Sequence, residues 1–198
     1  MVKRIVVEKS CGVIVDYQDF FLSQVERRAR ARLRANTRNF VRLLDYFRIP
    51  MIATLERPVY AKGAVPEDIK PHLGSRGKVF EKDLFDLTRE KPIRAHLKRL
   101  KKTQAIVAGC ETDVCVLQSC LGLLELGFEV FAVEELLFSS AANTDAALVR
   151  LRSEGVTVLS YKTLYFELIE AVGEAPHREK TIAAFGEFPD DLPEAGVP

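Results

Sequence analysis

The sequence has few of the residues that build metal sites and disulfide frameworks. Its 198 residues include three histidines, four cysteines and no tryptophan. No two cysteines form a CxxC pair, and no histidine lies at zinc-finger spacing from them. These absences argue against a zinc finger and against a disulfide-stapled secreted module. In a reducing compartment each cysteine is then either a small core residue or a reactive thiol.

The sequence also lacks an excess of either charge and any long apolar run. It has 29 Lys and Arg against 28 Asp and Glu, a balance that gives no general attraction to nucleic acid or anionic membranes. The longest apolar candidate, Val114 to Leu124, is shorter than the roughly 18 residues that a membrane span needs. The N-terminus reaches Glu8 and Lys9 before an apolar segment of signal-peptide length develops. We therefore expect no secretory signal and a cytoplasmic protein.

What is present is typical of a globular domain with a full core. Hydrophobic residues make up 47% of the chain and charged residues 29%. We expect one domain over residues 1–185, followed by an extended tail over 186–198 that carries four acids, no base and three prolines. No GxSxG, GxGxxG or P-loop pattern occurs, which argues against a serine hydrolase, a dinucleotide-binding protein and an NTPase.

Short apolar runs alternate with helical patterns along the chain. The six runs, each the length of a strand, are Cys11–Tyr17, Ile49–Leu55, Lys78–Glu81, Ala105–Gly109, Phe128–Val133 and Val156–Ser160. The helical patterns cover Ser23–Phe47, Pro92–Leu100, Asp113–Leu126, Asn143–Glu154 and Leu164–Val172. Gly127 and Gly155 stand where helix C-caps are expected. This alternation predicts an α/β fold, a mostly parallel six-stranded sheet covered by helices on both faces, with ligands bound beyond the carboxyl ends of the strands.

The first long helical segment is unusually basic. Between Ser23 and Arg48 it holds eight arginines against two acids. A nucleic-acid surface is conceivable, but no interleaved aromatics or recognition motif accompany the arginines. We expect a helix that faces solvent or another subunit and no nucleic-acid partner.

Three residues with chemical potential follow predicted strands. Asp16 ends the first strand, Lys82 follows the third, and Cys115 comes just after the fourth. Thr112 or Asp113 can cap the helix that follows, which would place Cys115 in its first turn, where the helix dipole favours thiolate. Each residue alone also has a structural interpretation: a cap, a solvated lysine or a buried thiol. Together, at one edge of a parallel sheet, they are the parts of a nucleophilic acyl-transfer site.

At these positions the sequence resembles the isochorismatase-like cysteine hydrolases, a family that includes nicotinamidases and N-carbamoylsarcosine amidase. The matching segments are VIVDYQDFF (13–21), EKDLF (81–85) and AGCETDVCV (108–116). The resemblance covers nearly the whole chain except its tail. It implies a three-layer Rossmann-like fold with a six-stranded parallel sheet, and a catalytic triad of Asp16, Lys82 and Cys115.

The resemblance also implies roles for these groups. Asp16 would take the proton from Cys115 and return it to the leaving amine, and Lys82 would balance the negative charges. The backbone N–H groups of Glu111 and Cys115 would hold the oxyanion. In relatives a cis peptide turns the first of these amides inward, which places such a bond here between Cys110 and Glu111.

Departures from the family pattern narrow the activity. Nicotinamidases share paired metal-binding histidines after the second strand, whereas His72 is the single histidine in that region, with His96 and His177 far away. We therefore expect no metal and no cofactor. Isochorismatase itself lacks the cysteine, so Cys115 favours amide hydrolysis over ether cleavage. Where many relatives have Asp-Ala after the fifth strand this chain has Glu134 and Glu135, and Glu111 replaces the usual small residue in the nucleophile loop.

Two functions from different classes remain open. The first is a cysteine hydrolase that cleaves the C–N bond of a small amide, imide or carbamoyl-type substrate, bound among Phe20, Phe85, Glu111 and Phe138. The second is a binding or scaffold protein that keeps the fold with little turnover. For either function we expect a homo-oligomer, a dimer or a tetramer, with a small molecule as its ligand.

Overall fold

The computed structural model describes residues 3–170, 179–180 and 183–184. The predicted tail over 186–198, His177 and the end of the last predicted helix lie outside these residues.

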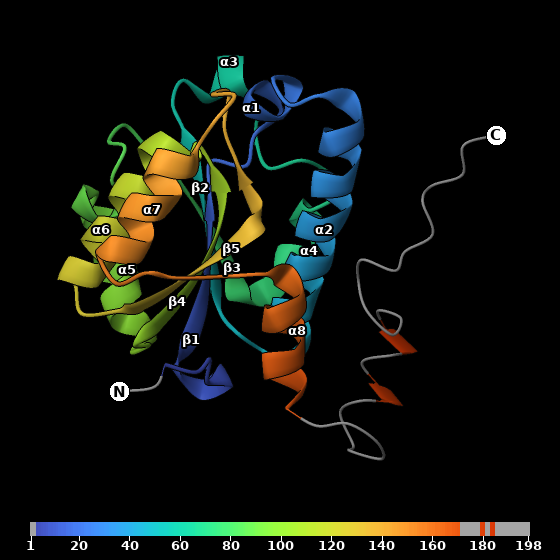
Figure 1. The fold of residues 1–198 in the computed structure, drawn as a ribbon, viewed down its shortest axis with the longest axis vertical. Helices are drawn as coiled ribbons and strands as arrows, with labels where there is room; N and C mark the ends of the chain where they lie inside the picture. Colours follow the sequence, from blue (N-terminus) through green and yellow to red (C-terminus); the bar gives the residue numbers. More distant parts are fainter. Residues whose placement is uncertain (1–2, 171–178, 181–182, 185–198) are drawn as a thin grey trace.

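The strands form one six-stranded, entirely parallel sheet in the order β3-β2-β1-β4-β5-β6 (Figure 1). Their bounds are β1 Ser10–Val15, β2 Met51–Glu56, β3 Gly77–Lys82, β4 Gln104–Cys110, β5 Glu129–Phe138 and β6 Thr157–Leu159. The order reverses direction between β1 and β4, and crevices for ligands form at such a point. Every residue of β1 and β4 is buried, which explains why their sequences are continuously apolar rather than alternating.

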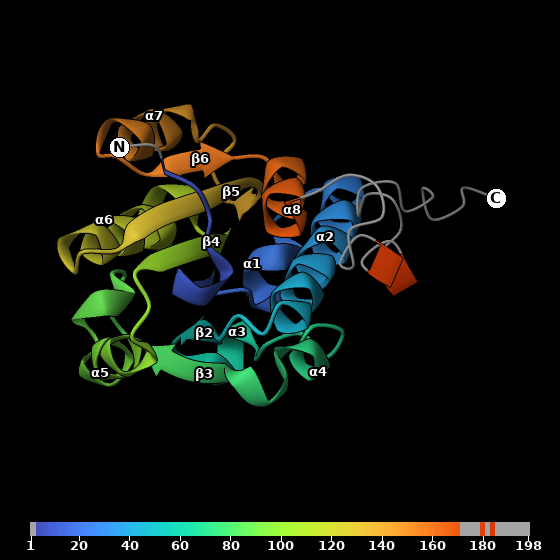
Figure 2. The ribbon, with the colours of Figure 1, turned by 90° about the horizontal axis from the view of Figure 1, so that it is seen from below.

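Helices cover both faces of the sheet, so the fold is the predicted three-layer arrangement (Figures 1 and 2). One layer holds α2 (Arg27–Tyr46), α4 (Lys70–Leu73) and α8 (Tyr161–Ile169), and the opposite layer holds α5 (Lys91–Leu100), α6 (Leu117–Glu125) and α7 (Asp145–Ser153). Each layer buries its own apolar cluster against the sheet: Phe40 and Leu44 of α2 on one face, Leu123 of α6 on the other. Among the described residues, no helix has both the length and the apolar character needed to cross a membrane.

The predicted helix over Ser23–Phe47 is wrong in its first residues. The chain instead forms a short helix, α1 (Asp19–Ser23), and begins α2 only at Arg27. The break has a local cause, since the Glu26 side chain accepts a hydrogen bond from the Ala29 N–H and caps the new helix. Further short elements that the sequence pattern did not predict are α3 (Val59–Lys62), α4, η1 (Val7–Lys9), η2 (Gly74–Arg76) and η3 (Leu87–Arg89). The predicted helix over Asp113–Leu126 begins as a single π-helical turn, η4 (Thr112–Val116), and continues as α6.

Three glycines have backbone conformations that would strain other residues. Gly127 and Gly155 follow the ends of α6 and α7 with φ of 85° and 97°, which confirms the predicted helix ends. Gly109 allows β4 to approach β1 closely, because a Cβ added there would lie 2.0 Å from the Val15 carbonyl oxygen, and its φ is +122°. This close approach brings the ends of β1 and β4 together at the crevice.

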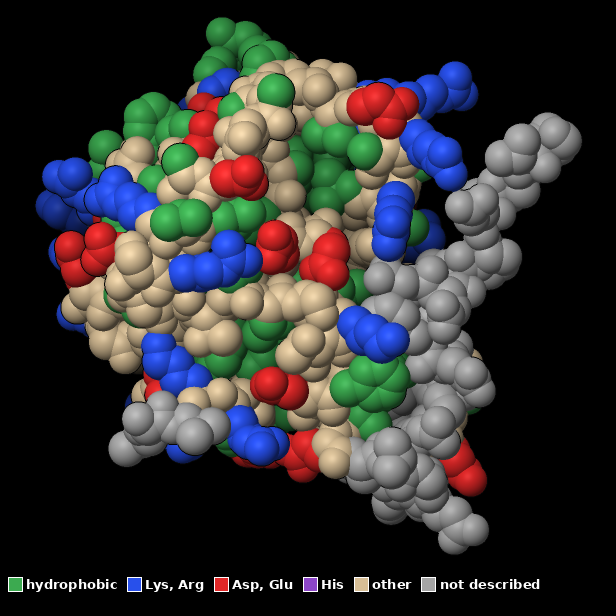
Figure 3. Space-filling model, in the orientation of Figure 1, with side chains coloured by type: hydrophobic (Ala, Val, Ile, Leu, Met, Phe, Trp, Pro, Cys, Tyr) green, Lys and Arg blue, Asp and Glu red, His purple; other side chains and the backbone are tan. Residues whose placement is uncertain are grey.

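The surface is basic along α2 and apolar near the carboxyl ends of the strands. Figure 3 shows Lys and Arg side chains along the outer side of α2, and hydrophobic side chains over α3. Of the large hydrophobic side chains in the described residues, that of Tyr60 in α3 is the most exposed, at 95%.

Candidate active site

Four ionisable side chains meet where β1, β2, β3 and β4 end. Asp16 directly follows β1, Glu56 and Lys82 are the last residues of β2 and β3, and Cys115 lies in η4 after β4. Three of them, Asp16, Lys82 and Cys115, were predicted from the sequence. Because β2 lies between β1 and β3, Glu56 stands between Asp16 and Lys82 at this edge.

Lys82 reaches across β2 to the other groups. Its Nζ lies 2.7 Å from Asp16 Oδ2 and 3.8 Å from Glu56 Oε2, and it donates to Cys115 Sγ at 3.5 Å. Two strand spacings amount to roughly 10 Å, so a side chain of this length is needed to bridge them. The ammonium is fully buried. Burial alone would lower the pKa of Lys82, but the charges of Asp16 and Cys115 raise it above its ordinary value.

Asp16 is held in one orientation. Its φ is +46°, a left-handed conformation that aspartate tolerates better than most residues. Its N–H donates to Thr54 Oγ1 at 3.1 Å, and the same hydroxyl donates to Asp16 Oδ1 at 2.8 Å. Burial raises the pKa of the Asp16 carboxyl, although the charge of Lys82 and hydrogen bonds from Lys82 and Thr54 oppose that rise. Asp16 is therefore a stronger base than an ordinary aspartate.

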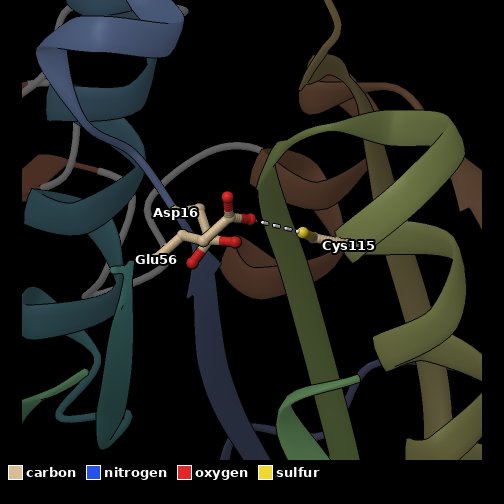
Figure 4. A group of neighbouring side chains, drawn as sticks. All are labelled: Asp16, Glu56 and Cys115. Atoms are coloured by element: carbon tan, nitrogen blue, oxygen red, sulfur yellow. Dashed lines mark hydrogen bonds between the residues drawn. The ribbon is translucent and has the colours of Figure 1, made fainter. Parts of the chain in front are cut away.

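The Cys115 thiol faces both carboxylates (Figure 4). Its Sγ donates to Glu56 Oε2 at 3.2 Å, and the side chain is buried. The expected shift toward thiolate is wrong: burial and then the charge of Asp16 raise the pKa of Cys115 above its ordinary value, and Lys82 offsets only part of this rise. In the free protein the Cys115 thiol is therefore protonated, and it lies next to the Asp16 carboxylate, whose pKa is raised. A general base needs this arrangement, because the carboxylate can then accept the thiol proton.

Glu56 is the ionisable residue of the site that the sequence analysis missed. Its Oε1 pairs with Lys62 Nζ, while its backbone N–H donates to Gln18 Oε1 at 2.7 Å. Burial opposes ionisation of Glu56, but hydrogen bonds from Lys62 and Cys115, with the charge of Lys82, outweigh it and lower the pKa of this carboxyl. The rule that selected Asp16 and Lys82 could have found Glu56, since it follows a predicted strand that ends at Leu55.

The turn that leads to Cys115 is not capped as predicted. Neither Thr112 nor Asp113 caps a helix: Thr112 Oγ1 donates to the Phe138 carbonyl at 3.0 Å, and Asp113 Oδ1 accepts from Ser139 at 2.6 Å. These bonds tie the turn to the end of β5 instead. The peptide bond between Cys110 and Glu111 is cis, the geometry that the family resemblance implies.

The expected pocket residues occupy different environments. Phe20 and Phe85 are 45% and 50% exposed, so both can line an opening. Phe138 is buried and packs edge-on against Tyr17 with ring centroids 5.6 Å apart, which makes it part of the core. Glu111 turns its carboxylate toward the Ser140 N–H at 3.1 Å.

The site contains a group of side chains that could in principle bind a metal ion. Their potential ligand atoms lie within 4.8 Å of one another, and they belong to Asp16, Glu56 and Cys115. Lys82 already contacts all three, at 2.7–3.8 Å. An ammonium therefore stands where a cation would bind, and a metal at these groups would have to displace a fully buried ion pair. The residues present do not fit a metal centre.

The other three cysteines are free and buried. Burial raises the pKa of Cys11 and Cys120 to about 12. Cys110 donates from its Sγ to the Asp16 carbonyl oxygen at 3.0 Å and supports the backbone beside the site.

Comparisons with known proteins show the family of this chain and solved structures with a similar fold. A family model described as the isochorismatase domain matches residues 10–163. Isochorismatase family protein 1A of Dictyostelium discoideum is 30% identical over 143 residues, 70% of this chain and 67% of the relative. Two of the solved structures with a similar fold illustrate this. One is the YcaC gene product of Escherichia coli, described as an octameric hydrolase of unknown specificity, with TM-score 0.85, 21% identity, and 98% and 93% of the two chains covered. The other is YcaC of Pseudomonas aeruginosa with covalent acrylamide, with TM-score 0.81, 24% identity, and 86% and 85% covered.

Proposed function

Because the chain belongs to the isochorismatase family of hydrolases, we propose that it is a cysteine-dependent hydrolase of a small amide, imide or carbamoyl-type substrate. The observation that carries this proposal is the buried contact of Lys82 Nζ with both Asp16 Oδ2, at 2.7 Å, and Cys115 Sγ, at 3.5 Å. One ammonium shared by a carboxylate and a thiol can balance negative charge on either group as a proton moves between them.

In the proposed reaction, Asp16 accepts the thiol proton while Cys115 Sγ bonds to the carbonyl carbon of the substrate. The carbonyl π electrons move to oxygen, and we assign the backbone N–H groups of Glu111 and Cys115 as donors to that oxyanion. The tetrahedral intermediate collapses, the C–N bond breaks, and Asp16 gives its proton to the departing nitrogen. Water, deprotonated by Asp16, then attacks the thioester and releases the acid, and the proton returns to the sulfur.

The substrate would enter past Phe20 and Phe85, the two exposed aromatics among the expected pocket residues. Glu111 would bound the pocket through its backbone, since its carboxylate is directed toward Ser140. Phe138 would shape the pocket only from within the core. We retain the proposed homo-oligomer, which exposed apolar residues such as Tyr60 support, and light scattering of the purified protein measures it directly.

A screen of small amides, imides and ureido compounds for released ammonia tests the proposal. The unsubstituted protein should release ammonia from at least one class, and Cys115→Ala, Lys82→Ala and Asp16→Asn should each lose activity by several powers of ten while remaining folded. A compound that binds without turnover in every assay would favour the binding-protein alternative. Undiminished hydrolysis in folded Cys115→Ala would remove the thiol from the reaction.

A further inference from the structure

Glu56 is the part of this site to which neither the family resemblance nor the proposed mechanism gives a role. It is a second carboxylate at the nucleophile, at the end of the strand between Asp16 and Lys82. Figure 4 shows its carboxylate, rather than that of Asp16, joined to the Cys115 sulfur by a hydrogen bond. A charged group in direct contact with the reacting atom must affect which substrates can approach it.

The position of Glu56 is fixed from both its backbone and its side chain. Gln18, which is fully buried, accepts from the Glu56 N–H and donates to the Glu56 carbonyl oxygen at 3.2 Å and to the Gly63 carbonyl oxygen at 2.7 Å. At the other end, Lys62 holds Oε1. The remaining oxygen, Oε2, is thereby aimed at Cys115, so the contact is built into the strand end.

The two carboxylates differ in what they can offer a substrate. Asp16 uses Oδ1 to accept from Thr54 and Oδ2 to pair with Lys82, and its side chain is fully buried. Glu56 retains 15% exposure, and its Oε2 has the thiol as its hydrogen-bond donor, with Lys82 Nζ farther away at 3.8 Å. A substrate that reaches the sulfur therefore meets Oε2 of Glu56 as the accessible anionic acceptor.

Glu56 is poorly suited to take the thiol proton itself. Its pKa is lowered where that of Asp16 is raised, so a proton leaving the sulfur is more stable on Asp16. Glu56 stays ionised through the reaction and keeps a negative charge beside the nucleophile. Such a charge attracts N–H donors and repels anions.

We propose that Glu56 is a specificity-determining residue that selects substrates with an N–H group on the carbonyl carbon, such as primary amides and ureido compounds. The substrate N–H replaces the thiol as donor to Oε2, and the released thiol then turns its proton to Asp16. Esters and substrates with a carboxylate at this position are disfavoured. This inference rests on the proposed function and narrows its substrate class.

The test measures alkylation of Cys115 and requires no turnover. The probes are acrylamide, which carries N–H donors, and methyl acrylate, which has an ester oxygen in their place. In both cases the sulfur bonds to the terminal alkene carbon, and the thiol proton ends on the neighbouring carbon. Each rate constant is followed by intact mass, assigned to Cys115 by peptide mapping, and divided by the rate constant of the same probe with glutathione.

The unsubstituted protein should prefer acrylamide on this normalised scale, and Glu56→Met should reduce the preference about tenfold or more. Glu56→Gln, which keeps a weaker neutral acceptor, should lie between them and provides the test if Glu56→Met does not fold. Glu81→Gln is the matched control. It removes a carboxylate from the neighbouring strand that pairs with Arg57 at 2.9 Å, and it should leave the preference unchanged.

Equal preference in the unsubstituted protein and both Glu56 variants would overturn the inference. The outcome is separable from the proposed function, because alkylation reports recognition at the sulfur and the ammonia screen reports hydrolysis. A preference that falls in the Glu56 variants without any detectable hydrolysis would support Glu56 as the selecting group and count against the hydrolase.

Discussion

Replacing Lys82 with methionine should destabilise the protein far more than the loss of a surface charge would. The side chains of Lys82 and Asp16 are both fully buried, with Nζ and Oδ2 2.7 Å apart. Lys82→Met keeps most of the side-chain volume but leaves the Asp16 carboxylate buried without its counter-charge. Removal of one partner from a buried pair costs about 3–5 kcal/mol. That is a large fraction of the roughly 5–15 kcal/mol by which an ordinary domain is stable.

The control is an exposed ion pair of similar length. Arg152 and Glu134 lie 2.9 Å apart, and each side chain is 48% exposed. Arg152→Met should change the free energy of unfolding by no more than about 1 kcal/mol. Urea denaturation followed by circular dichroism measures both variants, and unchanged m-values would establish that the native and unfolded states are comparable.

The double variant Asp16→Asn with Lys82→Met separates lost charge balance from lost packing. It removes both charges, so most of the stability lost in Lys82→Met should return.

The pH dependence of the stability of Lys82→Met gives a second check. Without Lys82 the pKa of the buried Asp16 rises further in the folded state, so the folded protein binds more protons than the unfolded chain, whose Asp pKa is about 3.9. The free energy of unfolding that Lys82→Met loses relative to the unsubstituted protein should therefore be smallest below about pH 3.9 and should increase as the pH rises. A loss below about 1 kcal/mol, or a double variant as unstable as the single one, would refute the reasoning.

Three further outcomes follow from the geometry. Gly109→Ala should lose roughly 2–5 kcal/mol in urea denaturation, because its Cβ would lie 2.0 Å from the Val15 carbonyl oxygen; a loss within experimental error would contradict the close approach of β4 to β1. The rate of Cys115 alkylation by iodoacetamide in the free protein should rise about tenfold per pH unit from pH 7 to 9, since burial raises the pKa of this thiol; a plateau near neutral pH would indicate a stable thiolate instead. Exhaustive chelation should leave alkylation and any hydrolysis unchanged, because Lys82 occupies the cation position, and about one equivalent of bound metal in elemental analysis would count against that assignment.

The alternation of apolar runs and helical patterns was sufficient to predict the sheet, its two covering layers and the edge where Asp16, Lys82 and Cys115 come together. Strand direction explains this success: all parallel strands deliver their last residues to one edge, whatever their order. Strand order was not predictable from the pattern. The pattern did not show that β2 lies between β1 and β3, so Glu56, although it follows a predicted strand, could not be placed between Asp16 and Lys82 from the sequence.

The protonation state of Cys115 was mispredicted for a different reason. A helix-start position is a local property, and it favours thiolate. Burial and the charge of Asp16 depend on how β1, β2 and η4 pack together, and they outweigh the local effect. The break between α1 and α2 has a local cause instead, since the Ala29 N–H donates to the Glu26 side chain and a new helix begins within a continuous helical pattern.

The central pairing of β1 with β4 also constrains how the chain is made. β1 pairs with β2 on one side and with β4 on the other, and its register with β4 joins Ser10 to Gln104. On the ribosome, β1, β2 and β3 are all synthesised before β4, so a precursor in which only these three strands had paired would expose one edge of β1. Open apolar edges recruit other strands, and nascent chains of this kind aggregate readily. We expect this edge to stay open to other strands until β4 has been synthesised and pairs with it.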